Sequence, residues 1–366
     1  MTTHAAYRET AFFSCLDGLR CLSILAVIWH HTGTRSEGLL LSQQGYLGVH
    51  LFFAISGFLI TTLLLRERER WGGISLGAFY VRRSLRIFPL YYAVLLLYVI
   101  LVWLLEPAGS AAREQFFANL PSYLTYTSNW FVAPDVRVIF YFAWSLAAEE
   151  QFYLVWPTVE KLLRGWRPVA VVAAVLIAQE LVRSAVAAST LPGEHLAVVI
   201  LLSVPPALLG GVVLAHVLHD RRGFDTVAPL LGTRWSAPLA LAGLLVAVEL
   251  AVPALIWMLM VLLVGTVVIR ESNGLGPLLR WRPVAHIGQV SYGMYLMHML
   301  CYNAVKRALP ALGLEQSWLL FPATVAAATI AATLSYRYYE SWFLGLKARF
   351  MRARVPTWPT TPDCAR

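Results

Sequence analysis

The chain has 366 residues, of which 58% are hydrophobic and only 13% are charged. Soluble domains carry about 25% charged residues, so this composition excludes an ordinary soluble globular protein and predicts a multi-pass membrane protein. The net charge of +9 is explained by basic loops that fix the cytoplasmic side of such a protein, so we expect no nucleic-acid partner. The four cysteines show neither zinc-ligand spacing nor a disulfide framework, and no metal is expected.

Predominantly apolar runs, typical of membrane-spanning helices, follow one another along most of the chain. We expect ten of them, at residues 14–32, 45–65, 87–105, 138–159, 169–188, 196–218, 236–250, 252–270, 284–305 and 318–344. The aromatic, semi-polar segment 115–132 could be an interfacial helix or a partly re-entrant element. The chain is therefore predicted to be an all-α integral membrane protein with about ten transmembrane helices. Residues 1–345 would form the membrane-embedded domain and residues 346–366 a basic tail.

The basic residues are distributed unequally between the two sides of this predicted bundle. With the N-terminus inside, 21 of the 29 lysines and arginines fall in inward segments, six in outward loops and two within spans. The positive-inside rule then places both termini in the cytoplasm and the protein in the cytoplasmic membrane of the cell. The first apolar run lacks a small-residue cleavage site, so we expect it to remain as the first span.

The first run, LDGLRCLSILAVIWHHTG at residues 16–33, contains ionisable side chains that each cost at least about 2.5–3.5 kcal/mol in a bilayer. Arg20 and His31 are eleven residues apart, so they project from one helix face, about 16 Å apart along the axis. Asp17 is the nearest charge partner of Arg20. The pattern predicts a polar stripe through the membrane. The alternative is that Asp17 and Arg20 only tie helices together while the histidines lie among headgroups.

Later runs also contain polar side chains that would be costly without partners. These are Glu149, Glu150, Ser291, Tyr295, His298, Arg337 and Glu340. Ser291, Tyr295 and His298 recur at helical spacing and share one face. His298 taken alone could equally be a structural, hydrogen-bonded residue. Because at least four helices aim polar groups inward, we favour one water-accessible central site over several independent ties.

An arginine-rich run, YVRRSLRIFPLYY, occupies residues 80–92 just before a predicted span. The guanidinium groups of Arg82, Arg83 and Arg86 can converge at this spacing on a helix. Arginine suits phosphate because its planar fork donates two hydrogen bonds at once. The alternative is ordinary topology and anchoring to membrane lipid headgroups.

Six motifs follow one another in a characteristic order. They are LDGLRCLSILAVIWHH at 16–31, GYLGVHLFFAISGFLIT at 45–61, YVRRSLRIFPLYY at 80–92, WSLAAEEQFYLVWP at 144–157, SYGMYLMH at 291–298 and SYRYYES at 335–341. In these motifs, and over nearly its whole length, the chain resembles the membrane-bound acyltransferase family 3. Members of that family transfer acyl groups, usually acetyl, to hydroxyls of extracytoplasmic glycans, lipids or small molecules.

The resemblance implies a donor and a set of catalytic residues. Acetyl-CoA or another acyl-CoA would be the donor, with its phosphates held on the cytoplasmic side by the three arginines of residues 82–86. His31 would act as general base towards the acceptor hydroxyl or carry the acyl group transiently. Arg20 would position the donor. Glu149 would orient a histidine or pair with a cation from another helix.

Other positions would line the acceptor side of the site. His50 stands where the family usually has an acidic residue, so its part could be catalytic, acceptor-binding or structural. Trp144, with the aromatic segment 123–130, would suit stacking on sugars, or would belong to an interfacial aromatic belt. Asp17, Tyr295 and His298 are further site-lining residues. The esterase-like extension of some relatives is absent, so transfer would finish in the membrane domain or pass to a partner.

We therefore expect an integral membrane O-acyltransferase, in the first instance an O-acetyltransferase, that acts on a hydroxyl of an extracytoplasmic glycan or glycolipid. One alternative is acylation of a secreted small molecule such as a macrolide. A different alternative is a transporter that uses its buried ionisable groups as a pathway. The sequence does not fix the acceptor, the acyl length or the oligomeric state.

Overall fold

The computed structural model describes residues 3–32, 43–133, 138–314 and 317–350, and within these ranges it contains helices and turns but no β-strand. The predicted all-α class is confirmed. The helices are α1 (His4–Glu9), α2 (Ser14–Thr32), α4 (Leu47–Trp71), α5 (Leu76–Leu105), α6 (Ala111–Leu124), α7 (Ser128–Phe131), α8 (Ala143–Leu162), α9 (Arg167–Ala187), α10 (Leu196–Leu202), α11 (Pro206–His219), α12 (Arg221–Leu231), α13 (Ser236–Glu249), α14 (Pro253–Ile269), α15 (Gly276–Leu279), α16 (Arg282–Gln289), α17 (Ser291–Ala311), α18 (Ser317–Ser335), the π-helix η1 (Tyr336–Glu340) and α19 (Ser341–Phe350).

Four helical stretches in the described residues are long and apolar enough to cross a membrane by themselves: α4, α5, α9 and the stretch Trp318–Leu346. Two bent pairs, α10 with α11 and α12 with α13, raise this number to six if each pair is one span. The helices α2, α8 and α17 fall outside this set, and they contain most of the predicted site residues, the others being in α4 and α5. Polar side chains lower their hydropathy, so a count by apolarity alone leaves them out.

Each predicted apolar run coincides with helical structure, and three of them are interrupted. Residues 196–218 break between α10 and α11 at Pro205 and Pro206, where the two helix axes differ by 48°. Proline has no backbone N–H and fixes φ, so a Pro-Pro pair stops one helix and starts the next. The run at 284–305 is divided between α16 and α17, and the last run contains the π-helix η1.

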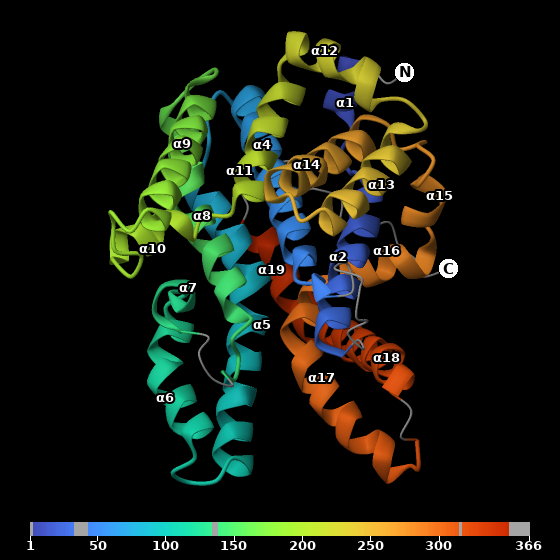
Figure 1. Cartoon of the computed structure of the whole chain (residues 1–366). Helices are drawn as coiled ribbons and strands as arrows, with labels where there is room; N and C mark the ends of the chain where they lie inside the picture. The colour runs from blue at the N-terminus through green and yellow to red at the C-terminus, as the bar shows by residue number, and fades with distance from the viewer. Residues whose placement is uncertain (1–2, 33–42, 134–137, 315–316, 351–366) are drawn as a thin grey trace.

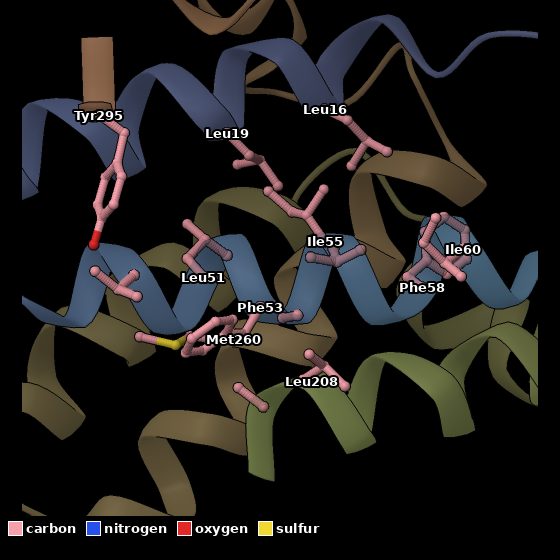
Figure 2. Packing of buried hydrophobic residues seen from close by; sticks show 14 of the residues in the cluster. Leu16, Leu19, Leu51, Phe53, Ile55, Phe58, Ile60, Leu208, Met260 and Tyr295 are labelled. Atoms are coloured by element: carbon pink, nitrogen blue, oxygen red, sulfur yellow. The ribbon is translucent and has the colours of Figure 1, made fainter. Parts of the chain in front are cut away.

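Helix α4 forms the centre of the bundle and packs against α2, α8, α11 and α14. Figure 2 shows α4 between α2 and α11, with their apolar side chains in mutual contact. The backbones of α4 and α11 come unusually close because a glycine on each helix faces the backbone of the other helix. A β-carbon at Gly57 would overlap the carbonyl oxygen of Leu208, and one at Gly211 would overlap that of Ala54. Small residues of this kind are the usual means of close helix packing in membranes.

Helix α5 is 30 residues long and begins at Leu76, well before the predicted start at 87. The side chain of Ser75 caps it by accepting a hydrogen bond from the backbone N–H of Ala78. The arginine-rich run therefore lies inside the helix and is not a separate loop. In Figure 1, α6 runs beside the later part of α5, while α17 and α18 form an antiparallel pair across the bundle.

The segment predicted to be interfacial or re-entrant folds as the two short helices α6 and α7. The turn between them passes through Tyr126, which has a positive φ of 54°. Paired carboxamides fix α7 to α8, since Asn129 and Gln151 exchange hydrogen bonds of 2.9 and 2.8 Å, and Gln151 also donates to the Tyr126 carbonyl at 2.8 Å. This contact holds the middle of α8, next to Glu149 and Glu150.

Candidate active site

Two groups of polar side chains meet inside the bundle. The first, which we call the histidine cluster, consists of His31, Tyr141, Ser145, Tyr295 and His298. The second, the arginine cluster, consists of Asp17, Arg20, Arg83, Arg86, Glu149 and Glu150. They are contributed by α2, α5, α8, α17 and the turn that precedes α8.

The histidine cluster begins at the end of α2. His31 is half-buried, and its Nε2 lies 3.0 Å from the hydroxyl of Tyr141. Its ring is stacked on that of His298, with centroids 5.1 Å apart and planes 27° apart. The two imidazoles come from α2 and α17, so the stack joins the first long helix to one of the last. The predicted site-lining position of His298 thus lies directly against His31.

Tyr295 holds the His298 ring of this stack in place. Its hydroxyl lies 2.6 Å from the Ser145 hydroxyl and donates to the Phe142 carbonyl at 3.1 Å. Its own backbone carbonyl lies 2.5 Å from Nδ1 of His298. Tyr295 therefore fixes both the start of α8 and the ring of His298.

The arginine cluster is centred on an ion pair between α5 and α8. Arg83 reaches Glu149 with Nη2 at 3.5 Å and Glu150 with Nε at 3.9 Å, and its guanidinium lies 3.6 Å above the Tyr153 ring. Glu149 also accepts hydrogen bonds from Ser56 and from the Tyr153 hydroxyl. Of the two partners predicted for Glu149, the structure thus provides the cation from another helix. A half-buried carboxylate with three donors is well compensated.

The predicted pairing of Arg20 with Asp17 is confirmed, at 3.0 Å between Nη1 and Oδ1. The three arginines of α5 do not converge. Arg82 pairs with Glu67 at 3.0 Å, whereas Arg86 makes no ion pair within 4 Å among the described residues. Arg86 is exposed, and Arg20, Arg83 and Glu340 are its charged neighbours. It is therefore the cation of this cluster that is available to bind an anion.

Two further predicted residues, His50 of α4 and Trp144 of α8, contact the ring of Phe53 in α4. The His50 ring is 5.9 Å from the Phe53 ring and 6.2 Å from that of Tyr46, and its buried Nδ1 has no hydrogen-bond partner in the described residues. Trp144 meets Phe53 edge-on at 6.1 Å. These two positions are therefore linked through one shared aromatic side chain.

The last motif contributes less than the sequence predicts. Arg337 is exposed and lies beside the ring of Tyr338, so it does not face the site, which corrects the prediction that it points inward. Arg337 lies in the π-helix η1, whose wider turns do not keep the α-helical side-chain spacing on which the prediction relied. Glu340 stays half-buried and accepts a hydrogen bond from Ser335 at 3.1 Å.

Sequence reasoning missed Tyr141, Ser145, Ser56 and Tyr153. Tyr153 and Ser145 lie four residues on either side of Glu149, which is the spacing of one helix face and could have indicated them. Tyr141 lies in a turn outside any helix and Ser56 on another helix, so no periodicity points to them. Within the described ranges no cluster of histidine, cysteine, aspartate or glutamate side chains could hold a metal ion.

Comparison with known proteins identifies the family of this chain. Residues 13–337 match the family model described as the acyltransferase domain. The chain belongs to this acyltransferase family. It is 29% identical over 361 residues to a peptidoglycan O-acetyltransferase of Listeria monocytogenes, which covers 89% of this chain and 55% of the relative. It is also 29% identical over 385 residues to a provisionally named peptidoglycan O-acetyltransferase of Bacillus subtilis, covering 94% of this chain and 58% of the relative.

This acyltransferase domain thus spans just over half the length of those two relatives. No solved structure matches the chain. The two clusters contain imidazoles, which can take up a proton, and guanidinium groups, which can stabilise negative charge. They are adjacent because α8 contributes Ser145 to one and Glu149 to the other.

Proposed function

We propose that this chain transfers an acyl group, acetyl in the first instance, from acyl-CoA to a hydroxyl of an extracytoplasmic glycan of the peptidoglycan kind. The match of residues 13–337 to the acyltransferase family is the observation that carries the proposal. The named activity of the Listeria relative supports acetyl as the group and a cell-wall glycan as the acceptor. Neither of the two named relatives supports the natural-product or transporter alternatives.

The proposed topology has about ten transmembrane helices and both termini in the cytoplasm, so residues 1–345 form the transferase domain in the cytoplasmic membrane. The unequal distribution of basic residues supports this orientation. Arg82, Arg83 and Arg86 then lie towards the side on which coenzyme A is present. Within this group Arg86, which has no carboxylate within 4 Å in the described part of the chain, is the main phosphate ligand. Arg83 keeps α5 and α8 together, and Arg20 orients the donor from α2.

In the proposed reaction His31 removes the proton from the acceptor hydroxyl. General base catalysis of this kind accelerates a reaction by about 10²–10⁴-fold. The hydroxyl oxygen attacks the thioester carbonyl, and the cations of the arginine cluster stabilise negative charge on the donor. His50 and Trp144 line the acceptor side, where the sugar rings of a glycan would stack on Trp144.

The test uses the purified chain in detergent, where both sides of the membrane domain are accessible. Labelled acetyl-CoA and peptidoglycan glycan strands are supplied, and ester formation is measured. We expect transfer by the wild type, and loss of at least about 100-fold in kcat for His31→Ala. The exposed His195 at the start of α10 provides a matched control, since His195→Ala should retain full activity. Transfer at the wild-type rate by a folded His31→Ala variant would remove this mechanism.

A further inference from the structure

The imidazole of His298 is held in one tautomer. Its Nδ1 lies 2.5 Å from the backbone carbonyl oxygen of Tyr295. A carbonyl oxygen only accepts hydrogen bonds, so Nδ1 must carry the proton. The neutral ring therefore has its lone pair on Nε2, which makes that nitrogen a hydrogen-bond acceptor and a base.

This Nε2 atom has no hydrogen-bond partner among the described residues. His298 is 1% exposed, so water from bulk does not satisfy the atom either. Buried polar atoms without a partner are rare in proteins, and each requires an explanation. Around the ring are aromatic groups, with the ring centroids of Phe142 and Tyr295 at 5.2 and 5.6 Å. None of these offers a donor that is aimed at Nε2.

The remaining neighbour is His31, whose ring is stacked on His298. His31 differs from it in two respects. It is half-buried, so it is the member of the pair that substrates can reach, and it already has the Tyr141 hydroxyl 3.0 Å from Nε2 and 3.3 Å from Nδ1. Two imidazolium ions at this separation would repel each other strongly, so at most one ring of the pair is positively charged at a time.

We propose that His298 is a positioning residue that orients the His31 ring and stabilises the positive charge that His31 acquires during acyl transfer. The inference rests on the proposed function and extends it. When the acceptor O–H bond breaks, its proton passes to His31, and the neutral His298 ring against it, with its lone pair on Nε2, stabilises the imidazolium that forms. The new O–C bond forms as the C–S bond of the acyl thioester breaks. His31 then gives the proton to the leaving thiolate, so no net proton is gained or lost.

The experiment measures kcat and KM of three His298 variants in the acetyl-transfer assay with acetyl-CoA and peptidoglycan glycan strands. His298→Phe keeps an aromatic ring against His31 but has no nitrogen, and His298→Gln keeps a hydrogen-bonding group that cannot take a proton. We expect both to lose at least about 100-fold in kcat, while both KM values stay within threefold. Free imidazole should restore part of the activity of His298→Ala, which leaves space for it.

A matched control is His216 in α11, another buried histidine, whose Nε2 bonds Glu160 at 2.7 Å. His216→Gln should lose stability but keep its kcat. A kcat for His298→Phe above half of the wild-type value would overturn the inference, as would a folded His298→Ala that imidazole does not rescue. The proposed function fails in a different way, because the wild type itself would then transfer no acetyl group.

Discussion

Ser145 and Glu149 lie one turn apart on α8, and each belongs to a different cluster of the candidate site. Ser145 contacts the hydroxyl of Tyr295, while Glu149 pairs with Arg83 of α5. The two side chains are separated by about 6 Å along the helix axis. A single rigid helix therefore sets the distance between the imidazole pair and the cations, and the contacts that hold α8 in place also set the geometry of the site.

Arg83 of α5 makes one of these contacts, because it faces both Glu149 and Glu150. We expect Arg83→Met to destabilise the protein by about 3 kcal/mol, because it leaves two largely buried carboxylates without their cation. Arg82→Met leaves a single carboxylate, Glu67, which still accepts a hydrogen bond from the backbone N–H of Ser75, so it should cost less, about 1–2 kcal/mol. Thermal unfolding in detergent compares the two. Adding Glu149→Gln to Arg83→Met should recover part of the loss, and equal stability of the two single variants would contradict this role.

Donor binding provides a separate prediction for Arg86. A charge-assisted hydrogen bond to phosphate contributes about 1.5–3 kcal/mol, so Arg86→Gln should raise the KM for acetyl-CoA by about tenfold or more. The KM for the glycan should not change. Arg222, an exposed arginine of α12, is the control for loss of one positive charge. If Arg86→Gln and Arg222→Gln had the same KM for acetyl-CoA, Arg86 would not be a phosphate ligand.

Close packing of α4 on α11 can be tested at Gly57. A β-carbon there would overlap the Leu208 carbonyl oxygen, so the backbone must shift, and we expect Gly57→Ala to cost about 1–3 kcal/mol of stability. A β-carbon at Gly77 in α5 would meet no described atom within 4 Å. Because alanine favours helix over glycine by about 1 kcal/mol, Gly77→Ala should be neutral or stabilising. The order of the two midpoints in thermal unfolding is the measurement, and the reverse order would refute this account.

Local patterns in the sequence predicted the features that depend on one helix alone. The first span agrees with α2 over 14–32, and Asp17 pairs with Arg20 three residues away. Partners from distant segments could not be found in this way. Arg83 meets Glu149 across 66 residues, a pairing that depends on how α5 and α8 pack. Periodicity also placed the start of α5 too late, because charged residues can remain helical when carboxylates face them.

Alkaline pH should weaken the attachment of α1, which lies outside the membrane-spanning helices. Burial raises the pKa of Tyr7 from 10.0 to about 12. The folded protein therefore keeps the phenol proton more tightly than the unfolded chain. This contribution is complete below pH 10 and is lost as the pH rises through 12, by up to about 2.7 kcal/mol for two pKa units. Tyr7→Phe should flatten the decline in unfolding free energy between pH 10 and 12, whereas Tyr338→Phe, at an exposed position, should leave it unchanged. Equal slopes for Tyr7→Phe and the wild type would show that α1 does not depend on a protonated Tyr7.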